Sequence, residues 1–205
     1  MGPIIKNFKN LDKDKIEKLK KLEPLYREWN QKINVISRKD MDNFYLHHVL
    51  HSMLISKVIT FAPGTKIMDF GTGGGFPSIP LAILFPECDF FLVDSINKKL
   101  VVAQSIADEI GLKNVQTSHS RVEDINSQFD FVISRAVTRL DEAWKLVEKN
   151  VIDLNKNTLP NGLLYLKGGN IENELPKSES IQIWPLKEFA VEPYFEEKIL
   201  VLIKR

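Results

Sequence analysis

A glycine-rich segment with carboxylates near it is the part of the chain whose residues and spacing best fit a chemical role. The segment Asp69-Phe70-Gly71-Thr72-Gly73-Gly74-Gly75-Phe76-Pro77 follows an apolar run and precedes a helical pattern. A doubly wound sheet binds its cofactor at such a position. The nicotinamide fingerprint is weakened, because Phe76 stands where a third glycine is required, and no Gly-Lys-Ser/Thr follows as a phosphate-binding P-loop requires. The segment predicts a cofactor loop of another kind.

The charges around this loop favour S-adenosylmethionine. A pyrophosphate is held by amide donors and cations, whereas S-adenosylmethionine carries a sulfonium and an ammonium group and has no phosphate. Asp69 precedes the first glycine, and Asp94 ends the next apolar run, where a carboxylate can accept hydrogen bonds from both ribose hydroxyls. Val122 and Glu123 follow a third run and could flank the adenine edge. Phe76 could close over the cofactor or pack under the following helix.

The segment Ser134-Arg135-Ala136-Val137-Thr138-Arg139 follows a fourth apolar run, where such enzymes present the group to be methylated. An Asn/Asp-Pro-Pro-aromatic motif, which would indicate methylation of exocyclic amines, is absent. Cys88 lies before the second run, on the wrong side of the sheet for a nucleophile in carbon-5 methylation. A ring nitrogen with a free lone pair, such as guanine N7, stays compatible because it needs no general base. Arg135 could hold guanine O6, bind the cofactor carboxylate or fix the strand end.

Other polar residues indicate no further chemistry. His47, His48 and His51 have no carboxylate cluster beside them in the sequence, so we expect a structural role. The single cysteine excludes an intramolecular disulfide, and no Cys/His cluster has zinc-ligand spacing, so no metal is expected. Lys167-Gly168-Gly169 could contact RNA phosphate or the substrate base, or form a simple turn.

The net charge of +1 hides an uneven distribution. Residues 1–39 hold eleven Lys and Arg against five acids, a charge of +6, and the remainder carries −5. Such an arm suits contact with nucleic acid, and a solvated lysine-rich helix is the alternative. With no signal peptide or membrane-length apolar stretch, we expect a soluble cytoplasmic protein, and nothing in the sequence suggests an obligate oligomer.

The hydrophobic pattern predicts elements that would position these residues. Steps of three and four between residues 12 and 36 indicate an amphipathic helix or helix pair divided at Pro24, and residues 41–61 read as a second helical stretch. The pattern then alternates between short apolar runs and helices, as in a parallel βαβ chain. We expect strands at 66–70, 90–94, 115–118, 129–134 and 162–167, helices at 77–85, 97–110 and 141–151, and a closing antiparallel pair at 180–184 and 198–203.

These elements amount to an α/β fold of the Rossmann-like class I methyltransferase type, with a mostly parallel seven-stranded sheet. Residues 63–205 would form the methyltransferase domain, and residues 1–62 a basic helical extension packed on it. A chain of 205 residues is enough for one substantial core.

The chain resembles the glucose-inhibited division protein B family from about Tyr26 to Gly169. Any one matching segment is modest, but their order and spacing together are specific. The matching segments are 29–34 (Trp-Asn-Gln-Lys-Ile-Asn), 67–82 with the glycine loop, 93–95 with Lys98 and Lys99, 120–124 (Ser-Arg-Val-Glu-Asp), 129–136 and 166–168.

The resemblance implies methylation of guanine N7 in small-subunit ribosomal RNA, either naked or in the 30S particle, with S-adenosylmethionine as cofactor. It places Gly71, Phe76, Val122, Glu123 and Arg135 on cofactor-contacting positions. Our own reading of the residues adds the acids Asp69 and Asp94 and the loop glycine Gly73.

One departure from the family concerns the second N-terminal helix. There the family often shows His-x-x-Asp-Ser, whereas this chain has His51 in place of the acid. A small-molecule methyltransferase and a non-catalytic RNA-binding relative stay open as alternatives, and a nicotinamide oxidoreductase is disfavoured by Phe76.

Overall fold

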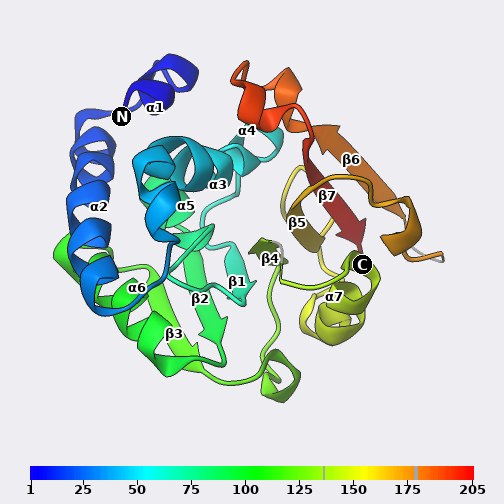
Figure 1. Ribbon diagram of the computed structural model, residues 1–205. Helices are drawn as coiled ribbons and strands as arrows, with labels where there is room; N and C mark the ends of the chain where they lie inside the picture. Colours follow the sequence, from blue (N-terminus) through cyan, green and yellow to red (C-terminus); the bar gives the residue numbers. More distant parts are fainter. Residues whose placement is uncertain (136, 178–179) are drawn as a thin grey trace.

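The computed structural model describes residues 1–135, 137–177 and 180–205 and is built around one seven-stranded sheet (Figure 1). The strand order is β3-β2-β1-β4-β5-β7-β6. Strands β1 to β5 pair in parallel, and β7 runs antiparallel between β5 and β6. The predicted class I methyltransferase sheet with its closing antiparallel pair is therefore confirmed. The strands are β1 (Lys66–Phe70), β2 (Asp89–Asp94), β3 (Val115–His119), β4 (Phe131–Arg135), β5 (Gly162–Gly168), β6 (Ile181–Pro185) and β7 (Lys198–Lys204).

The central strands are buried on both faces, which explains their continuous apolar runs. In β4 every residue except Arg135 is buried, and β5 is buried from Gly162 to Leu166. The edge strands β3 and β6 are only partly buried. The fourth strand begins at Phe131, two residues later than expected, because Phe129 forms only an isolated bridge with Val151.

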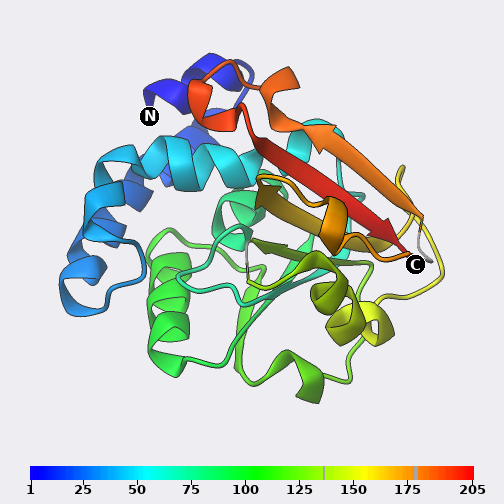
Figure 2. The same cartoon turned by 45° about the vertical axis from the view of Figure 1, so that its right-hand side comes forward.

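Helices cover both faces of the sheet. Helices α5 (Ser78–Leu84) and α6 (Asn97–Glu109) share one apolar cluster with the N-terminal helices, whereas α7 (Leu140–Val147) belongs to a second cluster. Figure 2 shows the same layers from another side. The predicted helix over 141–151 ends early, and a 3₁₀ turn follows it. The short 3₁₀ turns are η3 (Val122–Asp124), η4 (Glu148–Asn150), η5 (Glu172–Glu174), η6 (Leu186–Glu188) and η7 (Pro193–Phe195).

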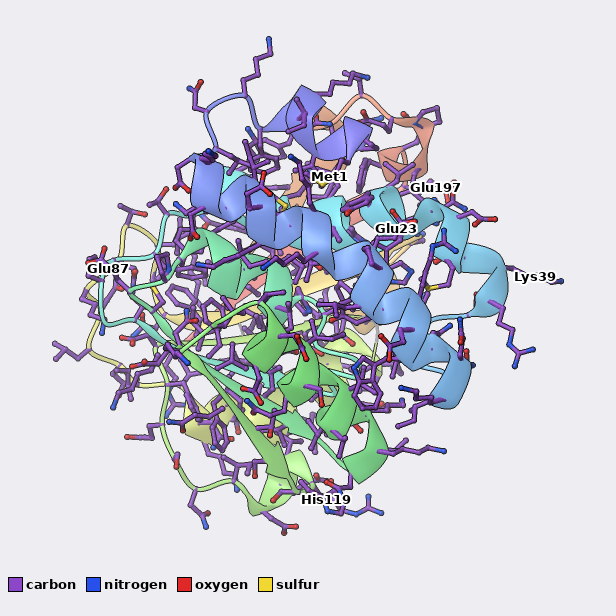
Figure 3. The ribbon with its side chains drawn as sticks, turned by 90° about the vertical axis from the view of Figure 1, so that its left-hand side faces the viewer. Met1, Glu23, Lys39, Glu87, His119 and Glu197 are labelled. Atoms are coloured by element: carbon purple, nitrogen blue, oxygen red, sulfur yellow. The ribbon has the colours of Figure 1, made fainter. Side chains whose placement is uncertain are left out.

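Helix α2 (Lys13–Lys32) is one continuous helix with Pro24 inside it, so the expected break at Pro24 is wrong. A proline lacks the N–H that would bond to the carbonyl four residues earlier, here that of Lys20. The Tyr45 hydroxyl contacts this carbonyl at 3.2 Å and the Leu19 carbonyl at 3.1 Å. A tertiary hydrogen bond thus replaces the missing one. Figure 3 shows α2, with Glu23 labelled, lying across the molecule, where it contacts α5 and α6.

The segment expected as one helix over 41–61 contains three kinds of helical turn. A 3₁₀ helix η1 (Arg38–Asn43) leads into a π-helix η2 (Phe44–Leu50), and α3 (His51–Met53) and α4 (Ile55–Val58) follow. A short helix α1 (Gly2–Asn7), which the sequence did not predict, packs against η2. π-Turns often occur at functional sites, and this one carries His47 and His48.

Candidate active site

Asp69 closes the glycine loop from its base. Its Oδ2 accepts hydrogen bonds from the Thr72 hydroxyl at 2.7 Å and from the Ser78 amide at 3.2 Å, which ties the two ends of the loop together. The side chain is fully buried, and burial raises the pKa of Asp69 to about 7. Its Oδ1 is also buried and has no partner in the part of the chain that the structure describes.

The loop turns on glycines in the left-handed region. Gly71 has φ +65°, and its amide donates to the Val93 carbonyl at 2.8 Å, which joins the ends of β1 and β2. From the N-terminal helix α2, the Tyr26 hydroxyl donates to the Gly74 carbonyl at 2.6 Å. The loop conformation therefore depends on both the sheet and the N-terminal helix.

A cavity of about 780 Å³ opens beside this loop, at the carboxyl ends of β1, β2 and β4. Its volume lies in the range of small-molecule and cofactor sites. Five of the predicted cofactor residues line it, and they come from four separate stretches of chain: Gly71, Asp94, Val122, Glu123 and Arg135.

Asp94 is the acid best placed to receive a ribose. It lines the cavity and is 7% exposed. Its Oδ2 accepts from the Gly73 amide at 2.9 Å and its Oδ1 from the Ile96 amide at 2.8 Å. Each carboxylate oxygen keeps a further acceptor site. Val122 and Glu123 form the wall of the same cavity after β3. The Asp94 and Glu123 carboxylates in the wall suit a ligand that carries hydroxyl groups and positive charge.

Three predicted residues lie behind the cavity wall. Asp69 holds the loop, and Gly73 donates its amide to Asp94. The Phe76 ring packs among aromatic rings, with centroids 4.9 Å from Tyr26 and 5.4 Å from His48. Phe76 thus packs under the helix side of the loop, the second of the two roles considered for it.

Arg135 lines this cavity and also a smaller one. Its guanidinium lies over the Phe76 ring at 5.4 Å, donates to the His47 carbonyl at 3.1 Å and contacts His48 Nδ1 at 3.1 Å. Burial lowers the pKa of Arg135. No carboxylate lies within ion-pair distance of it among the described residues. Fixing the strand end, one of the roles considered for Arg135, therefore depends here on the His47 carbonyl and the His48 and Phe76 rings.

The smaller cavity, of about 170 Å³, is surrounded by histidines. Asp40 Oδ1 contacts His47 Nδ1 at 2.5 Å, and its Oδ2 contacts His48 Nε2 at 2.7 Å. Because arginine can only donate, His48 Nδ1 must accept from Arg135, which leaves the proton on Nε2 facing Asp40. Burial and the Arg135 charge lower the pKa of His48 to about 4. His48 is thus a neutral link between Asp40 and Arg135.

The sequence did not associate these histidines with an acid, and Asp40 corrects that expectation. The spacing of 7 and 8 residues to His47 and His48 spans a 3₁₀ helix and a π-helix, so no regular helical period would have revealed it. Tyr194 and Lys198, which also line the cavity, come from the far end of the chain. Within residues 1–135, 137–177 and 180–205, no cluster of His, Cys, Asp and Glu could hold a metal.

The remaining candidates have mostly structural contacts. In the loop after β4, Ala136 lies outside the described residues, and the amides of Val137 and Thr138 donate to the Tyr165 hydroxyl at 2.8 and 3.0 Å. Lys167 pairs with Glu174. Cys88 is buried, and its thiol contacts the Ala62 carbonyl at 3.4 Å.

Five of the eleven basic residues of the N-terminal segment 1–39 pair with acids of the same segment. On α2, Lys18 bonds Asp14, Arg27 bonds Glu23 and Lys32 bonds Glu28, each one helical turn apart. Arg38 and Lys39, beside Asp40, are exposed and have no acid partner in the described chain. Figure 3 shows Lys39 directed outward. None of the described helices has the length and apolarity to cross a bilayer.

The chain matches, over residues 15–191, the family model described as "GidB: rRNA small subunit methyltransferase G". This protein belongs to that family. Two curated relatives, both named ribosomal RNA small subunit methyltransferase G, are similar over almost the whole chain. The relative from Bacteroides thetaiotaomicron is 53% identical over 98% of each chain, and that from Phocaeicola vulgatus is 52% identical over 99% of this chain and 98% of its own.

Solved structures of other methyltransferases share the fold. Magnesium protoporphyrin IX methyltransferase from Synechocystis, solved with bound S-adenosylmethionine, aligns with a TM-score of 0.59 at 16% identity, over 96% of this chain and 99% of its own. A methyltransferase from Aquifex aeolicus aligns with a TM-score of 0.53 at 15% identity, over 78% and 91% of the two chains. The family predicted from the sequence motifs is confirmed.

Proposed function

We propose that this protein transfers a methyl group from S-adenosylmethionine to N7 of a guanine in 16S ribosomal RNA. The observation that carries the proposal is the cavity of about 780 Å³ at the carboxyl edge of the sheet, with the Asp94 carboxylate in its wall, in a chain of the methyltransferase G family. Ligands of doubly wound sheets bind at this edge.

The residues divide into cofactor-holding and loop-holding groups. Asp94 accepts the ribose hydroxyls, Val122 and Glu123 lie along the adenine, and Gly71 permits close approach of the backbone. Asp69, Gly73 and Phe76 hold the loop in shape from behind.

The reaction requires little acid-base catalysis from the protein. When bound, S-adenosylmethionine supplies an electrophilic methyl group on a positively charged sulfur. The N7 lone pair of guanine forms the new carbon–nitrogen bond as the carbon–sulfur bond breaks, the bonding electrons stay on sulfur, and the positive charge moves to the purine. No proton leaves N7, so positioning provides most of the catalysis. Arg135, on the wall shared by both cavities, orients the reacting groups.

The RNA would approach the side that carries Arg38 and Lys39. Both are exposed, and both adjoin Asp40 in the wall of the smaller cavity. Unpaired cations beside a reaction site suit phosphate contact, whereas the paired lysines of α2 contribute less. A ribosomal RNA substrate also supports a cytoplasmic location. In this proposal the protein acts as a monomer, with residues 1–62 as an RNA-facing extension of the domain at 63–205.

Transfer of labelled methyl groups tests the proposal. Small-subunit particles and naked 16S RNA from cells lacking this gene would be incubated with the protein and methyl-labelled S-adenosylmethionine. After nuclease digestion, mass spectrometry should find the label in N7-methylguanosine. Tight cofactor binding without transfer to either RNA substrate would refute the RNA assignment and favour a small-molecule methyltransferase. Absence of cofactor binding would favour a non-catalytic relative.

A further inference from the structure

The smaller cavity has the size and the lining of a site for a single ring system. Its volume of about 170 Å³ lies below the range of roughly 300 to 1,000 Å³ typical of whole ligands, so a complete nucleotide would not enter it. Enzymes that modify a base take it out of the stack into a snug pocket and read its edge by hydrogen bonds. The cavity shares Arg135 with the cofactor cavity, so the two ligands would be neighbours.

His51 lines this cavity and holds an unused hydrogen-bonding atom in its wall. The side chain is 4% exposed, and its Nε2 is buried with no partner among the residues described. Its Nδ1 faces the Tyr194 hydroxyl at 3.4 Å. A buried polar atom left without a partner costs about 1 to 3 kcal/mol. Burial, together with the charges of Arg135 and Lys198, keeps the pKa of His51 well below its usual value, so the ring is neutral.

Two cationic donors, Arg135 and Lys198, also line this cavity. Arg135 uses two of its N–H groups on His47 and His48, and arginine has five. The Lys198 ammonium lies 5.1 Å from the Tyr194 ring centroid and has no acid within ion-pair distance in the described parts of the chain. His47 stacks on Tyr194 with centroids 3.9 Å apart, which forms a flat aromatic wall. The cavity thus presents cationic donors, a neutral imidazole and an aromatic surface.

We propose that this cavity receives the target guanine, with His51 Nε2 accepting from the N1–H edge and Arg135 or Lys198 donating to O6. The assignment rests on the proposed function, and it names the residues that select the base. The assignment uses the tautomer in which Nδ1–H donates to the Tyr194 hydroxyl and Nε2 keeps its lone pair, which the 3.4 Å contact permits. N7 stays free of protein donors, as methylation requires.

This arrangement distinguishes guanine from adenine. Adenine carries an amino group at position 6 and an unprotonated N1, so it would place a donor against the cations and an acceptor against the lone pair of His51. Mismatched buried hydrogen-bonding groups give strong discrimination because they are left unpaired. His51 and Lys198 are therefore specificity-determining residues, whereas Asp40 and His48 position Arg135.

The first test measures binding alone. Protein with ¹⁵N-labelled histidine is saturated with S-adenosylhomocysteine to fill the cofactor cavity, and guanosine 5′-monophosphate, adenosine 5′-monophosphate or ribose 5-phosphate is added. The imidazole nitrogens are followed by nuclear magnetic resonance. We expect the His51 Nε2 resonance to move with the guanine nucleotide only. Equal movement with ribose 5-phosphate would show a phosphate site and would overturn the proposal, as would no movement with any of the three.

The second test uses a matched pair of variants. Glutamine can place a polar atom at the position of Nε2, whereas asparagine reaches only the position of Nδ1. We expect His51→Asn to lower kcat/KM for methyl transfer to small-subunit RNA about 10-fold or more, since a buried base contact is lost. His51→Gln should keep most of the activity, and both should bind S-adenosylhomocysteine like the parent.

The two proposals can fail separately. If the parent protein transfers methyl groups and both His51 variants do so equally well, the guanine pocket is wrong and the proposed function stands. If the parent transfers nothing to ribosomal RNA, the proposed function fails, and the binding titration still decides whether the cavity selects guanine.

Discussion

The two cavities that share Arg135 are built by different means. The larger is lined at its core by residues that directly follow adjacent parallel strands, and its carboxylate Asp94 is anchored by the backbone amides of Gly73 and Ile96. The smaller is made of side chains brought from distant segments: Arg135 bonds His47 across 88 positions, and Tyr194 contacts His51 across 143. A cofactor common to many enzymes can be held by the sheet edge itself, whereas a particular substrate needs side chains that only tertiary packing assembles.

The largest effect expected concerns the carboxylate of the cofactor cavity. Asp94→Ala removes the acceptor of two backbone amides and of the ribose, so the Kd for S-adenosylhomocysteine should rise about 100-fold, measured by calorimetry. Asp89→Ala is the matched control, because Asp89 is exposed at the opposite end of the same strand. If both variants bind alike, the role given to Asp94 is refuted.

Two alanine substitutions distinguish the effect of close packing at Gly71 from the effect of a positive φ alone. Gly71 and Gly111 both have positive φ, but a Cβ on Gly71 would lie 2.5 Å from Val137 Cγ2, whereas one on Gly111 would meet open space. Gly111→Ala should cost about 1 kcal/mol of unfolding free energy from backbone strain. Gly71→Ala should cost about 1 to 3 kcal/mol more and also weaken cofactor binding, because Val137 lines the cavity.

Urea denaturation measures the two free energies of unfolding. Equal losses for Gly71→Ala and Gly111→Ala would mean that Val137 yields freely, and the close packing of the loop would then have no energetic role.

The contributions of Asp69, in the glycine loop, and of His48, beside the smaller cavity, to the free energy of unfolding should change in opposite directions with pH. Asp69 has its pKa raised to about 7, so its contribution to stability is present at low pH and is lost as the pH rises from about 4 to 7. His48 has its pKa lowered to about 4, so its contribution is present above about 6.5 and is lost as the pH falls toward 4. In the parent protein the two trends offset each other.

Substitutions expose the two trends. Relative to the parent, Asp69→Asn should gain stability as the pH rises through this window, and His48→Gln should gain stability as it falls, each by up to about 3 to 4 kcal/mol. Denaturation at several pH values between 4 and 8 measures both. Parallel slopes for either variant and the parent would show that the group in question does not titrate in the folded protein over that range.

The smallest expected effect concerns the exposed cations Arg38 and Lys39 beside the smaller cavity. Replacing both Arg38 and Lys39 by Gln should weaken binding of 16S RNA several-fold and lower the slope of log K against log salt by about 2, one for each cation. Replacing Lys66 and Lys113 by Gln removes the same charge at the amino end of the sheet, where both line a shallow pocket. A fluorescence titration at several salt concentrations compares the two pairs. An equal loss for both would place RNA contact elsewhere.

The cofactor region was predictable because its signals are local. The order of strand, glycine loop and helix, followed by Asp94 at the end of the next strand, appears in the sequence at short spacing, and parallel strands bring their carboxyl ends to one edge. The same reasoning placed Asp69, Gly73 and Phe76 near the ligand. In the structure Asp69 and Gly73 hold the loop through hydrogen bonds and Phe76 packs against Tyr26, and none of the three is among the residues that line the cavity.

The N-terminal helical segments, from α2 to η2, were predicted less well. Pro24 indicated a helix break, but the hydroxyl of Tyr45 satisfies the carbonyl that proline leaves free, and α2 continues. The Asp40 contact was missed because the intervening residues form 3₁₀ and π turns, whose periods differ from that of an α-helix. Neither feature follows from propensity, since both depend on a partner elsewhere in the fold.

The sequence alone determined the mostly parallel sheet with its closing antiparallel pair, the family and the position of the glycine loop, because alternating hydrophobic patterns and loop glycines act over short stretches of chain. Only the tertiary structure decided what surrounds Arg135. Its neighbours are His48 from the N-terminal helices, Phe76 from the glycine loop and the wall formed by Tyr194 and Lys198 from the closing hairpin. Side chains so far apart in the chain come into contact only when the core beneath them has packed, and the residue pattern of one strand or helix does not predict such contacts.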